Sequence, residues 1–363
     1  MNREPSLAKK VGWSAVATAF ALVFLEGLAS LYVAARDAPA PAVDRFAGER
    51  ALCLHDDELG WRLAPDLRVE DYFRDGGTLV TTSRGHRGLG EGAVALPERR
   101  YRIVVLGDSF TMGYGVSDDE TFPHQVTEFV PRVQSVNQGV SGYGLDQIYL
   151  AYVRDGAALE ADLVLCCLIE EDLRRMLSDR FADRYAKPRL EVIERQLFVR
   201  NVPVPDQDAP SNLALRASAF VHELGLARML PERVARASSG PARAGARDWQ
   251  TPAEFVLRDL AARCRDAGRK FAVVLLPTHR DAKTGGSAAS RWFARLAERS
   301  RIPIVDLGPD FVRLDHVERN RLYRLKEGDG HYTPEGNGRV ARLLLEHLPA
   351  VVPRFLEGRR RQG

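Results

Sequence analysis

The chain has few cysteines and almost no excess charge. Only four of its 363 residues are cysteine, and no Cys-x-x-Cys pair or His/Cys spacing typical of a metal site is present. Four cysteines are too few for a disulfide scaffold. The formal net charge is +3, and no basic stripe with interleaved aromatic residues occurs. The sequence therefore gives no sign of a bound metal, an organic cofactor or a nucleic-acid partner.

Long apolar runs are also scarce, and the most prominent one lies near the N-terminus. Residues 11–35 are mostly apolar and exceed the roughly 20 residues that a membrane-spanning helix needs. Signal-peptide cores are usually about 7–15 residues long, so the run predicts an uncleaved signal anchor, with cleavage after residues 38–40 as the alternative. Arg3, Lys9 and Lys10 precede the run and predict a cytoplasmic N-terminus. We therefore expect a single-pass inner-membrane protein whose remaining chain is periplasmic or extracellular.

The rest of the chain divides into a small N-terminal part and one large domain. Residues 37–48 are rich in Ala and Pro, which is typical of a linker. Short strand-like runs between residues 50 and 98 predict a β-rich preamble, in which we interpret Arg84, His86 and Arg87 as surface loop residues. The expected domains are 1–36 (cytoplasmic tail and transmembrane anchor), 37–98 (linker and preamble), 99–350 (catalytic domain with an insertion at 173–250) and 351–363 (basic tail).

From about residue 100 onward, the chain alternates between strands and helices. This alternation is typical of an α/β fold with a parallel sheet covered on both faces. Cys166 and Cys167 are neighbours on one strand, so we expect them to pack on opposite faces. The insertion at 173–250 follows a strand end, and we favour a lid over the active site. The expected strands are 102–106, 133–138, 162–169, 270–277 and 302–306, and the expected helices are 121–131, 144–155, 252–267, 288–300 and 335–347.

Two short motifs, far apart in the chain, carry the candidate chemistry. The apolar strand 102–106 runs into Gly-Asp-Ser109, which places a serine at the carboxyl end of a strand. His331 lies much further along, two residues after Asp329. A serine hydroxyl is a poor nucleophile until a base takes its proton, and the base works best when an acid orients it. Because catalytic groups collect at the carboxyl ends of parallel strands, the motifs predict a triad of Ser109, His331 and Asp329.

The same motifs resemble those of a known family. Four blocks, at residues 104–111, 136–144, 161–172 and 328–336, resemble the blocks of the GDSL/SGNH hydrolases, a family of esterases and carbohydrate O-acyl transfer enzymes. The resemblance covers roughly residues 100–350 and implies a three-layer α/β/α, flavodoxin-like fold with a central parallel sheet of about five strands. It also implies a serine ester hydrolase of EC 3.1 type, or an O-acyltransferase, without a cofactor.

The resemblance assigns roles to individual residues. Ser109 becomes the nucleophile and contributes its backbone N–H to the oxyanion hole, together with the N–H of Gly142. Asp108 and Asn137 lie in the same blocks and are further candidate site residues. The Asp-x-His spacing of the fourth block resembles that of alginate-type O-acetyltransferases in the wider group. His331 is then the general base, and Asp329 is the acid that orients it.

The third block departs from the family pattern, which reads Gly-x-Asn-Asp. Asp172 matches the Asp, but Glu171 stands where the family has the Asn that donates to the oxyanion. An ionised Glu has no proton to donate, and the loss of one oxyanion donor costs about a hundredfold to a thousandfold in rate. One explanation is that burial beside Glu170 and Asp172 keeps Glu171 protonated. A second is a substitute donor, Asn137 or Gln138, and a third is a weak enzyme or a non-catalytic relative.

These inferences favour an acyl-ester hydrolase that acts outside the inner membrane on an acylated glycan or a small ester. Hydrolysis and acyl transfer share the same residues and differ only in the acceptor, which is water or a sugar hydroxyl. A non-catalytic carbohydrate-binding relative is the alternative that Glu171 favours. The presence of Ser109, His331 and Asp329 argues against it.

Overall fold

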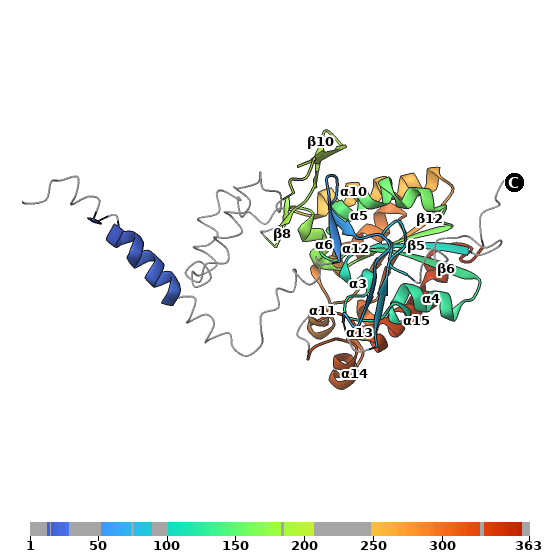
Figure 1. Ribbon diagram of the computed structural model, residues 1–363. Helices are drawn as coiled ribbons and strands as arrows, with labels where there is room; N and C mark the ends of the chain where they lie inside the picture. The colour runs from blue at the N-terminus through green and yellow to red at the C-terminus, as the bar shows by residue number, and fades with distance from the viewer. Residues whose placement is uncertain are drawn as a thin grey trace, which may run out of the picture. The chain divides into compact units, whose positions relative to one another are not determined.

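The computed structural model describes residues 13–14, 16–28, 52–73, 76–88, 101–182, 185–206, 248–326 and 330–357 (Figure 1). Contacts divide the chain into two compact units. One unit comprises Met1–Arg45 and Gln207–Arg247, and the other comprises Phe46–Asp206 and Asp248–Gly363. The second unit contains the preamble and the four motif blocks. The boundaries expected at residues 98/99 and 350/351 stay predictions.

The described N-terminal residues, 13–14 and 16–28, are helical. Large apolar side chains of this helix, among them Trp13, Phe20 and Val23, are exposed. Within the described ranges, no helix is both long and apolar enough to span a membrane. The rest of the run at 11–35, where the sequence predicts the anchor, lies outside the described residues.

Five parallel strands form the central sheet, as the alternating pattern predicts. They are β5 (Tyr101–Gly107), β6 (Val133–Gly139), β7 (Leu163–Leu168), β12 (Lys270–Leu275) and β13 (Ile304–Asp306). The strand order is β13-β12-β7-β5-β6, and all neighbouring pairs are parallel. In order of appearance this is 2-1-3-4-5, the order of flavodoxin-like folds. The central strands are buried almost throughout because both faces of the sheet are covered.

Helices cover both faces of the sheet and complete three layers (Figure 1). The long helices are α4 (Phe122–Phe129), α5 (Leu145–Arg154), α10 (Gln250–Asp266), α12 (Ala288–Ser300) and α15 (Pro334–Val351). Side chains of α5, α10 and α12 pack in one core, and those of α4 and α15 pack in the other. Cys166 belongs to the first core and Cys167 to the second, which confirms that they point to opposite faces. All five expected helices are present.

Short helices follow several strand ends and are not revealed by the sequence pattern. They are α3 (Ser109–Met112), α6 (Glu170–Arg175), α11 (His279–Thr284), α13 (Gly308–Val312), α14 (His316–Arg321) and the 3-10 turns η2 (Asp118–Glu120) and η3 (Gly156–Leu159). Such elements are too short to show a 3.6-residue period. The helices α3 and α6 follow β5 and β7 and carry candidate site residues.

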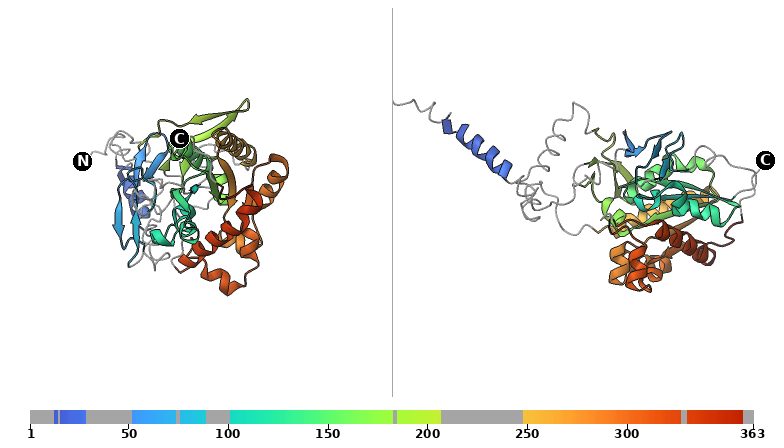
Figure 2. Two further views of the ribbon diagram at one scale, coloured as in Figure 1. Left: turned by 90° about the vertical axis from the view of Figure 1, so that its right-hand side faces the viewer. Right: turned by 60° about the horizontal axis from the view of Figure 1, so that its bottom comes forward.

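Two antiparallel strand pairs precede the sheet and belong to the same unit, which agrees with the expected β-rich preamble. The pairs are β1 (Cys53–Asp56) with β2 (Gly60–Leu63), and β3 (Arg68–Glu70) with β4 (Thr78–Val80). Figure 2 shows these blue strands against the α/β core in both views. Arg84 is exposed, but His86 and Arg87 are buried. The interpretation of His86 and Arg87 as surface loop residues is therefore wrong.

The insertion at 173–250 begins with two further antiparallel pairs. The pairs are β8 (Arg180–Phe181) with β9 (Tyr185–Ala186), and β10 (Arg189–Ile193) with β11 (Gln196–Arg200). Residues 207–247 of the insertion lie outside the described residues. The lid that we expect from this insertion stays a prediction.

Candidate active site

Ser109 begins the short helix α3 directly after β5, at the carboxyl edge of the sheet. The helix is capped by Asp108, whose Oδ1 accepts a hydrogen bond of 2.9 Å from the Phe110 N–H. Only glycine fits at Gly107, because a Cβ atom there would lie 2.0 Å from Oγ1 of Thr111. The strand, the glycine and the cap together turn the chain so that Ser109 starts the helix.

The structure brings Ser109 and His331 together. Ser109 Oγ lies 2.7 Å from His331 Nε2. When Nε2 carries no proton, the hydroxyl donates to it, and the imidazole is placed to act as a general base. The rings of Phe110 and Tyr114 each lie 4.8 Å, centroid to centroid, from the imidazole. These two aromatic contacts restrict how the imidazole can turn.

The third expected member of the triad, Asp329, lies outside the described residues, so its role stays a prediction. The backbone at His331 is held by its neighbours. The Arg324 N–H donates to the His331 carbonyl over 2.8 Å. The hydroxyl of Tyr332 donates to the Pro277 carbonyl over 2.8 Å. These bonds tie the segment that carries the candidate base to the core.

Gly142 lies in the turn after β6, and its backbone is left-handed, with φ of +78°. A Cβ atom at this position would lie 2.8 Å from the ring of Phe181, so glycine serves both the conformation and the close approach. Within the described part of the chain, neither the Gly142 N–H nor the Ser109 N–H donates a hydrogen bond. Both N–H groups are thus available for the oxyanion role that the resemblance implies.

Glu171 is exposed and not buried beside Glu170 and Asp172. It lies in the first turn of α6, and its side chain is exposed. Glu170, its neighbour, is also not buried and accepts a hydrogen bond of 3.0 Å from the Ala289 N–H. The explanation of Glu171 by burial is therefore wrong.

The amides proposed as substitute donors are engaged elsewhere. Nδ2 of Asn137 donates to the carbonyls of Thr111 and Met112 over 2.9 and 3.4 Å, and Oδ1 of Asn137 accepts from the Gly139 N–H over 2.9 Å. The amide of Gln138 lies 3.0 Å from Nε2 of His86. Asn137 is a buried brace between β6 and α3, and it does not replace the missing oxyanion donor.

A partly buried arginine that the motifs did not reveal links the first and third blocks. Nη1 of Arg175, at the end of α6, lies 3.1 Å from Asp108 Oδ2 and 2.8 Å from Asp172 Oδ1. It also donates to the Tyr143 carbonyl over 3.2 Å. Asp108 and Asp172 are fully buried, and Asp108 caps the helix that Ser109 begins. The spacing of Asp172 and Arg175 by three residues on one helix is a signal that could have identified this pair.

The electrostatics of this cluster are unbalanced, because one guanidinium faces two carboxyl groups. Desolvation and, after it, the negative charge of Asp108 raise the pKa of Asp172 well above its usual value. The Arg175 charge and the Ile169 N–H, which donates to Asp172 over 2.9 Å, oppose that rise. No group of three or more His, Cys, Asp or Glu side chains in the described ranges is placed to hold a metal ion.

Several solved structures are similar to this chain. A lipolytic protein of the G-D-S-L family from Desulfitobacterium hafniense is 14% identical, with a TM-score of 0.38, over 69% of this chain and 99% of that chain. A variant of an acetyl xylan esterase from Geobacillus stearothermophilus is 11% identical, with a TM-score of 0.39, over 72% and 97% of the two chains. A two-domain esterase active on acetylated mannans is 12% identical, with a TM-score of 0.40, over 72% and 51%.

No family model matches the sequence, and no curated protein matches it. Two of the similar structures are described as members of the G-D-S-L lipolytic family.

Proposed function

We propose that this protein is a serine-dependent acyl-ester hydrolase. The observation that carries the proposal is the 2.7 Å contact between Ser109 Oγ and His331 Nε2. A serine hydroxyl bonded to an imidazole nitrogen is the activated nucleophile that acyl transfer needs. The N–H groups of Ser109 and Gly142 have no partner within the described residues and supply the donors that a developing oxyanion needs.

In the reaction that we infer, His331 takes the Ser109 proton as Oγ attacks the acyl carbonyl carbon. The C=O π pair moves onto the carbonyl oxygen, which accepts hydrogen bonds from Ser109 N–H and Gly142 N–H. His331 then gives its proton to the leaving alcohol, the ester bond breaks, and an acyl-enzyme remains. Water, activated by the same imidazole, releases the acid. Asp329 is assigned to orient the imidazole.

The substrate class that we infer is an ester of a small acyl group on a glycan or a small alcohol. Support comes from the resemblance of the four blocks to a family of esterases and carbohydrate O-acyl transfer enzymes. If a sugar hydroxyl takes the place of water, the same residues perform O-acyl transfer. The two reactions are separated by measuring, with an acetylated oligosaccharide, whether free acetate or a newly acetylated acceptor sugar accumulates.

We also propose that residues 11–35 anchor the chain in the inner membrane, with the catalytic unit outside the cytoplasm. Support comes from the basic residues Arg3, Lys9 and Lys10 before the apolar run. The exposed apolar side chains of the described N-terminal helix agree with it. Protease added to spheroplasts should digest the catalytic unit and leave an N-terminal fragment in the membrane. Full protection of the chain would contradict this location.

Hydrolysis of p-nitrophenyl acetate by the full chain tests the proposed activity. Ser109→Ala and His331→Ala should each lower kcat/KM by about a thousandfold or more, because the triad acts as a unit. His316→Ala changes an exposed histidine on α14 and is the matched control, which should keep the wild-type rate. Circular dichroism checks that each variant is folded.

Activity that survives in Ser109→Ala would rule out the serine mechanism. If the folded wild-type protein hydrolysed neither the nitrophenyl ester nor the acetylated oligosaccharide, the result would favour the alternative of a non-catalytic carbohydrate-binding protein. Glu171 is the residue that favours this alternative.

A further inference from the structure

The N-terminal strand segment, defined here as residues 52–73 and 76–88, lies in the same compact unit as the candidate catalytic residues. Two of its side chains, Arg87 and Trp61, donate hydrogen bonds to two backbone turns of the candidate active site. One is the nucleophile turn, residues 113–118, which follows α3. The other is the oxyanion turn, residues 140–143, which follows β6.

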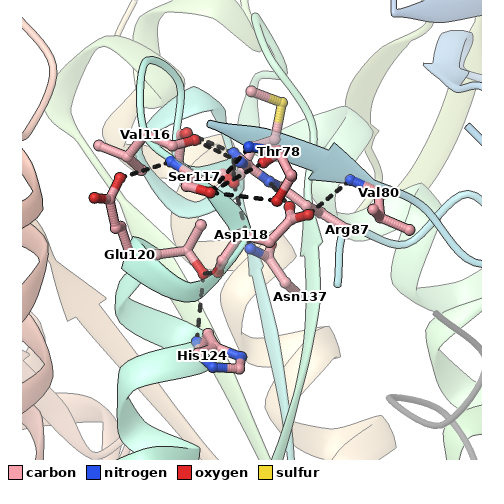
Figure 3. Close-up of polar contacts among 12 residues, drawn as sticks. Thr78, Val80, Arg87, Val116, Ser117, Asp118, Glu120, His124 and Asn137 are labelled. Carbon is pink, nitrogen blue, oxygen red and sulfur yellow. Dashed lines mark hydrogen bonds and ion pairs between the residues drawn. The ribbon is translucent and has the colours of Figure 1, made fainter. Parts of the chain in front are cut away.

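Arg87 holds the nucleophile turn. It is 3% exposed, and Figure 3 shows its side chain among Val116, Ser117 and Asp118 of this turn. Nη1 donates to the carbonyls of Met112 and Gly113 over 2.8 and 2.5 Å, and Nη2 donates to the Val116 carbonyl over 2.6 Å. Carbonyl groups at a helix C-terminus have no intrahelical partner. Arg87 therefore satisfies the open end of a helix that is too short to be stable by itself.

Asp118 ties the same turn to the N-terminal strand segment a second time. Its Oδ1 accepts a hydrogen bond of 2.8 Å from Nε of Arg87, and its Oδ2 accepts one of 2.8 Å from the Val80 N–H. Beside it, Oγ of Ser117 accepts a hydrogen bond of 3.0 Å from the Thr78 N–H. Figure 3 shows β4 lying along this turn, with these bonds between them. The nucleophile turn is thus fixed by both a side chain and a strand backbone.

Tyr114 connects the N-terminal strand segment to the candidate general base through ring contacts. Its ring lies 4.8 Å from the imidazole of His331 and 4.8 Å from the ring of Phe73, which belongs to the N-terminal strand segment. The guanidinium carbon of Arg87 lies 5.9 Å from the centroid of Phe73. A continuous set of ring contacts therefore runs from the segment to the base.

Trp61 makes the corresponding contact with the oxyanion turn. Its indole Nε1 donates to the Ser141 carbonyl over 2.9 Å, and the hydroxyl of Tyr143 donates to the Trp61 carbonyl over 2.6 Å. These two bonds bracket Gly142. The Trp61 ring also lies 5.8 Å from the ring of Phe181, and the Phe181 ring packs closely against Gly142.

We propose that the N-terminal strand segment completes the active site, with Arg87 and Trp61 as positioning residues. Arg87 sets the nucleophile helix and Tyr114 against His331, and Trp61 sets the oxyanion turn at Gly142. The proposal rests on the proposed serine hydrolase function. Arg87 and Trp61 bond to the two turns that the proposed reaction uses, whereas the buried Thr81 and Thr82 bond within the segment itself.

Arg87→Lys in the full chain tests the contact with the nucleophile turn. Lysine keeps a positive charge beside Asp118, but it lacks the planar set of donors that reaches three carbonyls. The probe is a fluorophosphonate, whose phosphorus bonds to the Ser109 oxygen as fluoride leaves and the proton passes to His331. We expect the labelling rate constant, per titrated active site, to fall about tenfold to a hundredfold, the cost of misplacing a catalytic group by about 1 Å. KM for p-nitrophenyl acetate should stay near the wild-type value.

The matched control is Arg68→Lys on β3. Arg68 belongs to the same segment, its side chain is 66% exposed, and it pairs with the exposed Glu70. This variant should be labelled at the wild-type rate.

Two milder variants keep the proposal testable if Arg87→Lys fails to fold. Trp61→Phe keeps an aromatic ring but removes the indole N–H that holds the Ser141 carbonyl, and it should slow labelling about fivefold. Phe73→Leu removes the ring that packs on Tyr114 and should slow labelling by a similar factor, about fivefold. Because the rate is expressed per titrated active site, a loss of folded protein does not lower it.

Amide hydrogen exchange gives a readout that does not depend on catalysis. Amides of residues 113–118 should exchange faster in Arg87→Lys, and those of residues 140–143 should exchange faster in Trp61→Phe. Faster local exchange together with slower labelling supports the proposal. Wild-type labelling rates, or wild-type exchange, in both variants would overturn it. A wild-type protein that is not labelled would contradict the proposed function instead, and the exchange rates would then decide the positioning role alone.

Discussion

Arg87, which is buried, and Arg175, which is partly buried, hold the two ends of the nucleophile helix α3, and they do so differently. Arg175 acts at the start of the helix through its cap, Asp108, and shares Nη1 between two carboxylates. Arg87 acts at the end of the helix through the carbonyls of Met112 and Gly113, and it is hydrogen-bonded to one carboxylate. The start of the helix is therefore held mainly by charge, and its end is held mainly by hydrogen bonds to the backbone.

The two arginines also come from different parts of the chain. Arg175 lies in α6, after the neighbouring strand β7, so the α/β core itself supplies it. Arg87 comes from the N-terminal strand segment, whose strands are not part of the five-stranded sheet, and it forms an isolated antiparallel bridge with Asn137 of β6. A helix of one turn at a strand end is not self-supporting. Here the core supports its beginning, and the added segment supports its end.

Arg175→Met should have the largest effect on stability. It leaves Asp108 and Asp172 buried without their counter-charge, and removing one partner of a buried ion pair costs about 3–5 kcal/mol. Urea unfolding measures the change. Arg174→Met, at an exposed neighbouring position, is the control and should stay within about 0.5 kcal/mol of wild type. An Arg175→Met loss no larger than that of the control would contradict a helix start held by charge.

Asp118→Asn tests the other end of the helix and should cost less. Arg87 loses its hydrogen-bonded carboxylate but keeps three carbonyl acceptors, so we expect a loss of about 1.5–3 kcal/mol, the range for a hydrogen bond to a charged group. Asp119→Asn, at an exposed position, is the matched control. If Asp118→Asn destabilised the protein more than Arg175→Met, the contrast between the two ends would be reversed.

Gly142→Ala should affect the oxyanion turn, whose Ser141 carbonyl accepts a hydrogen bond from Trp61. The left-handed backbone costs about 1–2 kcal/mol for alanine, and the new Cβ would also press on Phe181. Gly285→Ala is a matched control, because Gly285 has φ of +84° and open space around its Cβ position. Both variants should lose stability. Only Gly142→Ala should also lose about a hundredfold in kcat, the cost of a misplaced oxyanion donor.

The pH dependence of the unfolding free energy should reveal the buried carboxyl group of Asp172, which lies beside the start of α3. Burial raises the pKa of Asp172 in the folded state above the usual value of 3.8. A folded-state pKa above the unfolded one means that the folded protein binds more protons, so stability is lost as pH rises from about 4. The difference in unfolding free energy between wild type and Asp172→Asn should therefore fall as the pH rises above about 4. A difference that grows with pH would contradict this.

Glu171→Asn should have the smallest effect. Because Glu171 is exposed, the unfolding free energy should change by less than about 0.5 kcal/mol. We expect kcat/KM to rise less than the roughly hundredfold that a complete oxyanion donor is worth. A rise of that size would show that position 171 lies in the oxyanion hole and that the glutamate suppresses activity there.

The sheet, the long helices and the meeting of Ser109 with His331 were accessible from the sequence. Strand β7 is an uninterrupted apolar run and β5 is apolar from Ile103 to Leu106, and the strands alternate along the chain with amphipathic helices. The turn after β5 requires a glycine, a capping aspartate and a serine in that order, and the sequence shows all three residues next to one another.

The residues that position the candidate site could not be predicted from the sequence, for physical reasons. Arg87 and Trp61 bind backbone carbonyls, and any residue presents a carbonyl, so the sequence carries no trace of the partner. Arginine is also almost never fully buried unless it is paired, which favoured a surface position for Arg87. The short helices α3 and α6 are set by caps and tertiary contacts, so their residues show no period.

The identity of the nucleophile is tested most directly by fluorophosphonate labelling of the full chain, followed by mass spectrometry of its peptides. We predict a single adduct on the peptide that contains Ser109, lost in Ser109→Ala and formed far more slowly in His331→Ala. An adduct elsewhere, or labelling of Ser109 at the wild-type rate without His331, would show that the 2.7 Å contact between these two residues is not the source of the serine's reactivity.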